Sequence, residues 1–168
     1  MKKTFSILSI ILLLILGTAC KSSNYNLNKE ISAFDLTLKV DESTNFKEDY
    51  RSNENYLFID ENSGLYLVVQ QIKYSTDVPE FKDMADKFIA DMNNEEESDA
   101  LVNKDNAVVI INKKLRSSSS HDDKYYHIDG LYLNGTTYYC VFVYGDYDSM
   151  TQNKDWVKES LKTVTFTS

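Results

Sequence analysis

The fold is decided by residues 125–144, YYHIDGLYLNGTTYYCVFVY, in which two β-rich runs flank Asn134 and Gly135. An Asn-Gly pair tolerates the two positive φ angles that a tight hairpin turn needs. A two-residue turn at this pair would place Asp129 opposite Cys140 on the neighbouring strand. Both faces of the hairpin are largely apolar, so we expect a sheet that is covered on both faces.

Five further segments have the pattern of strands, because they alternate apolar and polar residues or form a short apolar run. They are residues 34–40, 56–59, 65–74, 107–111 and 163–167. The turn-forming residues 60–64 end in glycine and predict a hairpin between the second and third of these segments. Residues 41–55 are charged and interrupted, so we predict a loop there.

Two segments have the apolar spacing of amphipathic helices. Asp77 and Glu80 are spaced as a capping box and predict the start of the first helix. Its apolar stripe consists of Phe81, Met84, Ala85, Phe88, Ile89 and Met92. Asp148 or Ser149 is predicted to cap the second helix. Its inner stripe consists of Met150, Asn153, Trp156, Val157, Ser160 and Leu161.

The elements therefore follow one another as β-β-β-α-β-β-β-α-β. Hairpins join the strands, and no βαβ unit of uniform length repeats, which indicates an α+β protein with an antiparallel sheet. Strands that are apolar on both faces need cover on both faces. We therefore expect the sheet to be sandwiched between the two helices.

The chain ends with a helix at Asp155–Leu161 that leads into a strand at Val164–Phe166. Together with the element order, this ending resembles the PsbP-like or DcrB-like α/β/α sandwich over residues 33–168. The resemblance is one of pattern and assigns no functional residue. It implies an accessory or binding protein at a membrane, in a family where catalysis is not the usual role.

The first twenty positions have the order of a bacterial export signal. Two lysines precede an apolar run at Phe5–Leu16, which is shorter than the roughly 20 residues of a membrane-spanning helix. Gly17-Thr18-Ala19-Cys20 follows and resembles the end of a lipoprotein signal, which implies lipid such as palmitate on Cys20. Gly17 stands where that family usually has a branched aliphatic residue. Ordinary cleavage and secretion, or an uncleaved anchor, therefore remain alternatives.

These features predict three parts of the chain. Residues 1–19 form the signal peptide, residues 20–32 comprise the lipidated Cys20 and a flexible tether, and residues 33–168 form a single α+β domain. The expected location is extracytoplasmic, at the cell membrane through lipid on Cys20. In a cell with two membranes, Lys21 after the cysteine would by analogy permit transfer to the outer membrane.

The formal net charge of the chain is −8. Removing residues 1–19 removes two lysines and no acid, so the charge of the mature chain is −10. Such an acidic chain is poorly suited to bind nucleic acid or anionic lipid headgroups. We therefore expect attachment to the membrane through lipid and not through a basic surface.

No residue pattern predicts a catalytic, cofactor or metal site. Cys140 is the only cysteine left once Cys20 is acylated, and we interpret it as a small buried side chain and not as a nucleophile. His127 lies close by in sequence, and its spacing from Asp129 is too common to indicate a catalytic pair. A calcium site at residues 95–99 and a metal site at residues 121–123 are weaker alternatives to solvated loops.

The sequence thus favours a non-catalytic binding or accessory module of the cell envelope. The tyrosine-rich hairpin Tyr125–Tyr147 is the candidate contact face, because tyrosine offers a large contact area at low entropic cost. The alternative is that these tyrosines only fill the sheet. Two other functions are an immunity-type lipoprotein that neutralises a basic toxic partner and a hydrolase with an unrecognised carboxylate site.

Overall fold

The structure is a computed structural model, and it describes residues 25–93, 98–104, 107–112, 116–117 and 124–167. The predictions for the signal peptide, Cys20 and His121–Asp123 lie outside these residues. Of the acidic run 95–99, residues 95–97 also lie outside them, and Ser98 and Asp99 begin strand β6 (Ser98–Lys104) instead of continuing a loop. The elements are β1 Leu27–Ala33, β2 Leu36–Asp41, β3 Lys47–Arg51, β4 Asn55–Asp60, β5 Leu65–Lys73, α2 Phe81–Asn93, β6 Ser98–Lys104, β7 Ala107–Asn112, β8 Arg116–Ser117, β9 Lys124–Asn134, β10 Thr137–Gly145, α3 Tyr147–Leu161 and β11 Thr165–Phe166. Neither of the two described helices is long and apolar enough to cross a membrane.

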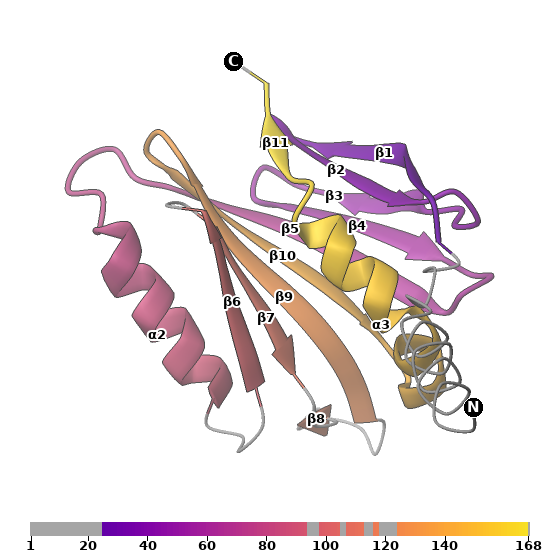
Figure 1. The fold of residues 1–168 in the computed structure, drawn as a ribbon. Helices are drawn as coiled ribbons and strands as arrows, with labels where there is room; N and C mark the ends of the chain where they lie inside the picture. Colours follow the sequence, from indigo (N-terminus) through magenta and orange to yellow (C-terminus); the bar gives the residue numbers. More distant parts are fainter. Residues whose placement is uncertain (1–24, 94–97, 105–106, 113–115, 118–123, 168) are drawn as a thin grey trace, which may run out of the picture.

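The strands form two antiparallel sheets (Figure 1). The larger sheet has eight strands in the order β3-β4-β5-β10-β9-β7-β6, with β8 paired to β9, and the smaller has the order β1-β2-β11. Helix α3 and the small sheet lie on one side of the large sheet, and α2 lies on the other. The antiparallel α+β class with helices on both sides is therefore confirmed. The predicted element order was incomplete, because it lacked β1, β3, β6 and β8 and assigned all strands to one sheet.

The two additional strands near the N-terminus explain most of this difference. Strand β1 occupies residues 27–33, where we predicted the end of a flexible tether, and it pairs with β2. Strand β3 occupies residues 47–51, where we predicted a loop, and every residue in it is exposed. Both are edge strands that carry charged residues, as edge strands often do to prevent pairing with other chains. They therefore lack the apolar alternation by which strands are recognised.

The central hairpin forms as predicted, but its turn lies one residue further along the chain. Asn134 pairs with Thr137, so Gly135 and Thr136 occupy the turn. Gly135 has a φ of 60°, which suits the first central position of a type II′ turn. The predicted register was therefore wrong, and Cys140 lies opposite Leu131 instead of Asp129. Cys140 is thus paired two residues away from its predicted partner, and a shift by two residues keeps every side chain on its predicted face.

Both helices begin at other residues than the predicted caps. Asp77 has a φ of 52°, and the first helical hydrogen bond of α2 runs from the Met84 N–H to the Glu80 carbonyl oxygen, 3.1 Å apart. Glu80 therefore takes the capping place predicted for Asp77. In α3 the cap is Asp146, whose carboxylate accepts a hydrogen bond of 2.7 Å from the Ser149 N–H.

Two apolar clusters fill the space on either side of the large sheet. The first lies between the sheet, the small sheet and α3, and its fully buried members include Leu38, Leu67, Val141 and Leu161. The second lies under α2 and is built on Tyr138, Leu131 and Cys140, with the predicted helix stripe packed against them. The predicted stripes are confirmed for the described side chains, although Asn153 of α3 is only partly buried.

Asp35 ties the small sheet to the tip of the central hairpin. Its carboxylate accepts hydrogen bonds from the Tyr139 hydroxyl and from the Asn134 amide at 2.9 Å, while its backbone oxygen accepts one from the Thr167 N–H at 2.8 Å. Phe34 precedes it with a φ of 59°, a strained value for a large side chain. The Phe34 ring packs at 4.7 Å from the Tyr56 ring, so aromatic packing offsets this strain.

Replacing Asp35 with alanine should lower the free energy of unfolding by about 1–3 kcal/mol. Tyr139 is only 2% exposed, so its largely buried hydroxyl would lose this partner. Urea denaturation of the purified protein measures the loss. Asp155→Ala is the control, because Asp155 is exposed on α3. Equal stabilities of the two variants would contradict this role of Asp35.

Candidate functional site

One half of the large sheet carries an apolar surface that no described element covers. Cross-strand pairing places two rows of side chains on the α2 side of the sheet. We define the open face as these residues: Leu57, Ile59, Tyr66, Val68, Phe142 and Tyr144. All six are partly exposed, although four of them are aliphatic or phenylalanine side chains that are usually buried in a sheet.

The pairing of β3 extends both rows at the sheet edge. Tyr50 lies opposite Leu57 and is 56% exposed, and Lys47 lies opposite Ile59. At the other end, the Tyr125 ring packs edge-on against the Tyr144 ring at 5.8 Å. The surface therefore runs from β3 across β4, β5 and β10 to β9.

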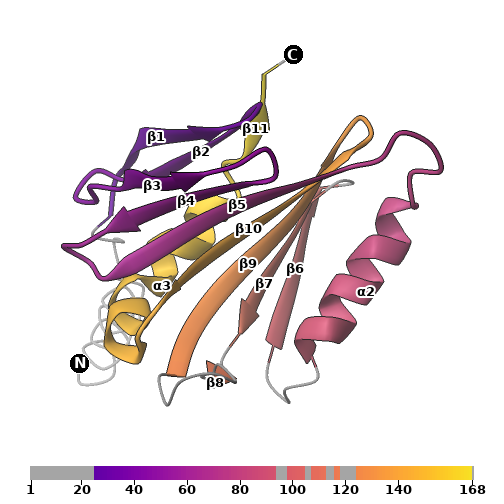
Figure 2. The ribbon, with the colours of Figure 1, turned by 180° about the vertical axis from the view of Figure 1, so that it is seen from behind.

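Helix α2 leaves this surface uncovered because it lies toward the opposite end of the sheet. Figure 2 shows the sheet from the side opposite α3, with α2 beside β6 and no described element over β4 and β5. The start of α2 covers the ends of β10 and β5, where Ile72, Tyr138 and Cys140 belong to the cluster beneath the helix. Tyr138 donates a hydrogen bond of 2.8 Å to the Pro79 carbonyl oxygen. Of the open face, only Phe142 packs against a buried cluster.

Two tyrosines form the centre of the open face. Tyr66 and Tyr144 lie directly opposite each other and stack with ring centroids 5.0 Å apart and planes 9° apart. Burial, and then the neighbouring Tyr66 and Tyr125, raise the pKa of Tyr144. The Tyr144 hydroxyl therefore stays neutral at physiological pH, and the pair offers a flat surface of large area with polar ends.

The tyrosine-rich hairpin divides between core and surface. Tyr132, Tyr138 and Tyr139 are at most 3% exposed and fill the two clusters. Tyr144 belongs to the open face, and the Tyr125 ring packs against it at the border. Of the two predicted roles, filling the sheet thus describes the buried tyrosines, and a contact face is possible only for the partly exposed ones.

A shallow acidic depression borders the open face at Ile59. It has a volume of about 240 Å³ and lies between the β2–β3 and β4–β5 connections. Glu48, Asp49 and Glu61 line it as exposed acids, and Lys47 is the one base in its lining. The buried Asp60 is already bonded within its turn, because its carboxylate accepts from the Asn62 N–H at 3.0 Å and from Ser63.

The histidine and cysteine that a catalytic site would use are both buried. Nδ1 of His127 lies 2.7 Å from the Asp129 carboxylate, and the two residues are 8% and 0% exposed. Burial, with a smaller contribution from Asp129, raises the pKa of the Cys140 thiol to about 12. A thiol that stays protonated is a poor nucleophile, so the arrangement supports the predicted structural role of Cys140.

Neither a second depression nor a metal-binding group provides a better site among the described residues. A depression of about 380 Å³ lies beside Phe34, Lys73 and Thr137, but Asp35 and Tyr139 of its lining already bond to each other. No group of three His, Cys, Asp or Glu side chains that could hold a metal ion occurs among the described residues.

Sequence reasoning did not predict the exposure of Leu57 and Ile59 on β4, nor the position of Tyr50 beside them on β3. We predicted a loop that included Tyr50, and we expected Leu57 and Ile59 to be covered like any apolar strand residue. One signal was available: β5 is apolar on both faces, yet a single helix of α2's length cannot cover an eight-stranded sheet.

Comparison with known proteins supports the fold and no more specific assignment. No family model matches the chain, and no curated protein matches it in sequence. A crystal structure from Bacteroides thetaiotaomicron matches with a TM-score of 0.57 at 8% identity, over 85% of this chain and 50% of that one. This chain thus spans half the length of that protein.

Two other solved structures match over nearly their whole length. PsbP (CyanoP) of Synechocystis sp. PCC 6803 has a TM-score of 0.53 at 10% identity, over 89% of this chain and 98% of that one. The Ran-binding protein Mog1p of Saccharomyces cerevisiae has a TM-score of 0.50 at 9% identity, over 84% and 96%. The expected PsbP-like fold is therefore confirmed.

Proposed function

We propose that this protein is a lipid-anchored, non-catalytic binding module of a bacterial cell envelope, which presents its open face to another envelope protein. The observation that carries the proposal is the open face itself. It is a contiguous set of aromatic and aliphatic side chains on a rigid sheet, and surfaces of this kind mark sites of protein association.

Three further features support the proposal. The first twenty residues resemble a lipoprotein signal that ends at Cys20, which would hold the domain at a membrane. The buried thiol and the buried His127–Asp129 pair are poorly placed to meet a substrate. The fold is also that of a protein described as Ran-binding, so it is compatible with a binding role.

An immunity-type lipoprotein remains a second candidate, because the acidic depression at the rim of the open face would favour a basic partner. A hydrolase would need two carboxylates that face a substrate cleft. Asp60, the buried acid of the acidic depression, is already bonded within its turn.

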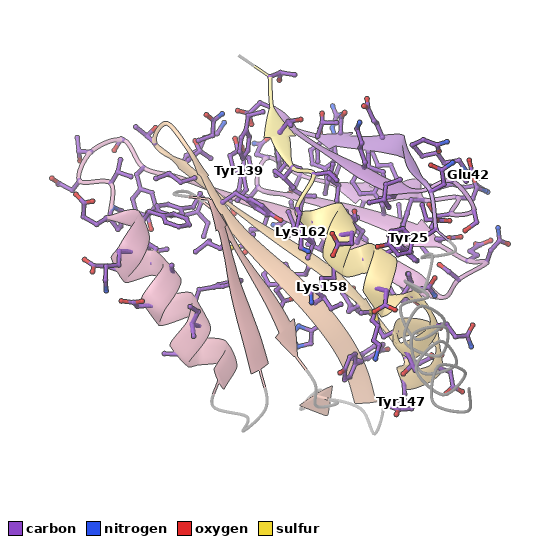
Figure 3. The ribbon with its side chains drawn as sticks, viewed as in Figure 1. Tyr25, Glu42, Tyr139, Tyr147, Lys158 and Lys162 are labelled. Carbon is purple, nitrogen blue, oxygen red and sulfur yellow. The ribbon has the colours of Figure 1, made fainter. Side chains whose placement is uncertain are left out.

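The test is co-purification of crosslinked neighbours from intact membranes. Tyr66→Ala and Val68→Asp should each abolish recovery of the partner, because they remove contact area or place a charge in the centre of the contact. Tyr147→Ala is the matched control, because Tyr147 is 55% exposed but lies at the start of α3, on the other side of the sheet (Figure 3).

Each variant is first compared with the parent protein by thermal unfolding, so that a loss of partner is not a loss of fold. If the folded Tyr66→Ala protein recovers the same neighbours in the same yield as the parent protein, the open face is not the contact surface and the proposal fails.

A further inference from the structure

We infer that the open face is the docking site for a basic amphipathic helix of another protein. This inference rests on the proposed function and names the chemistry of the partner. It is argued from the vacant width of the sheet and from the charge at its rim.

The vacant part of the sheet has the dimensions of one helix. Helix α2 packs on β9, β7 and β6, and α3 packs on the opposite side. The open part of the α2 side comprises β3, β4 and those parts of β5 and β10 that carry the open face, and the three spacings between these strands at about 4.8 Å give a width of ~14 Å. A helix with its side chains is about 10–12 Å wide. A second helix beside α2 would therefore complete the layer.

The open face also provides the contacts that such a helix uses. Its two rows, Leu57–Val68–Phe142 and Ile59–Tyr66–Tyr144, lie two residues apart along each strand. That separation is about 7 Å, close to the 5–6 Å between side chains three or four positions apart on a helix. Apolar residues at helical spacing could therefore contact both rows, as in other helix-in-groove complexes.

The charge at the rim selects a basic partner. Asp49 and Glu61 are exposed around the depression beside Ile59, and Lys47, opposite Ile59, offsets one of them. Glu48 pairs with the core residue Phe58 and therefore lies on the other face of the sheet. The chain as a whole has a net charge of −8. Lysine or arginine residues flanking the apolar stripe of a helix would be attracted to this rim, which would speed association and exclude acidic competitors.

The same charge disfavours two other occupants. A second copy of this chain would bring an identical acidic rim to the contact, and the two rims would repel each other. The headgroups of anionic lipids would be repelled in the same way. The experiment therefore has to distinguish a foreign protein segment from this chain and from lipid.

The test places the photo-crosslinking amino acid p-benzoylphenylalanine at Tyr66 of the full chain in intact cells. The adduct is digested, and the crosslinked peptide is identified by mass spectrometry. We expect a peptide of another protein with net positive charge and apolar residues three and four positions apart. The same amino acid at Tyr147 should not give this adduct.

The outcomes separate the inference from the proposed function. An adduct with a neutral or acidic segment of another protein overturns the inference and leaves the proposed function standing. Adducts only with a second copy of the chain or with lipid overturn both, and so does the absence of any adduct from Tyr66.

Variants of the rim test the charge directly. Asp49→Lys combined with Glu61→Lys should lower the yield of the Tyr66 adduct several-fold, and added salt should lower the yield of the parent protein in the same way. Glu48→Lys is the matched control, because Glu48 lies on the other face of β3, and it should not lower the yield. An adduct yield that is unchanged both by the double variant and by added salt overturns the inference.

Discussion

Replacing Cys20 with alanine should transfer the protein completely from the membrane fraction to the soluble fraction. The expectation follows from the free energy of lipid attachment. Burial of an acyl chain contributes about 0.8 kcal/mol per methylene, and two chains make residence at a membrane lasting. The acidic chain offers no comparable electrostatic attraction to an anionic surface. Fractionation of cells that express each form, with labelling by radioactive palmitate, measures the effect.

Cys140→Ala is the matched control because Cys140 is the only other cysteine. Its thiol is buried in the cluster under α2, so we expect this variant to keep both its label and its membrane location. A Cys20→Ala protein that stays with the membrane would show that the leader is an uncleaved anchor. A parent protein that carries no label and is released into the medium would show ordinary secretion.

The elements with a strong apolar period were predictable from the sequence. Both helix stripes, the central hairpin and the strands on both of its sides are where the period of two or of 3.6 places them. Strands β1 and β3 were not predictable, because they lie at sheet edges and carry lysine and glutamate where a buried strand has apolar residues. The separation into two sheets depends on β1 and was missed with it.

The open face is a property of the tertiary structure. Leu57, Val68 and Phe142 have the same composition and spacing as core residues, and only the position of α2 along the sheet leaves them partly exposed. Sequence patterns report which side chains prefer burial and do not report whether an element of the same chain provides it. The register error in the hairpin has a similar origin, because Asn134 and Gly135 permit two adjacent turns.

Gly130→Ala should lower the free energy of unfolding by about 2–5 kcal/mol. Gly130 lies in the middle of β9, and a Cβ atom there would come within 2.4 Å of the Tyr132 hydroxyl and 2.8 Å of its ring. The ring has little room to move, because Tyr132 is 3% exposed and its hydroxyl donates a hydrogen bond of 2.6 Å to the Leu161 carbonyl oxygen. Urea denaturation measures the loss.

A double-mutant cycle identifies the cause of this loss. If the added methyl group acts by displacing the Tyr132 ring, the Gly130→Ala, Tyr132→Leu double variant will be less destabilised than the sum of the two single variants. Gly135→Ala serves as the comparison, because no atom lies within 4 Å of its Cβ position and only its φ of 60° is unfavourable. We expect that variant to lose about 1 kcal/mol. Additive effects at Gly130 and Tyr132 would mean that the added methyl group does not act through the Tyr132 ring.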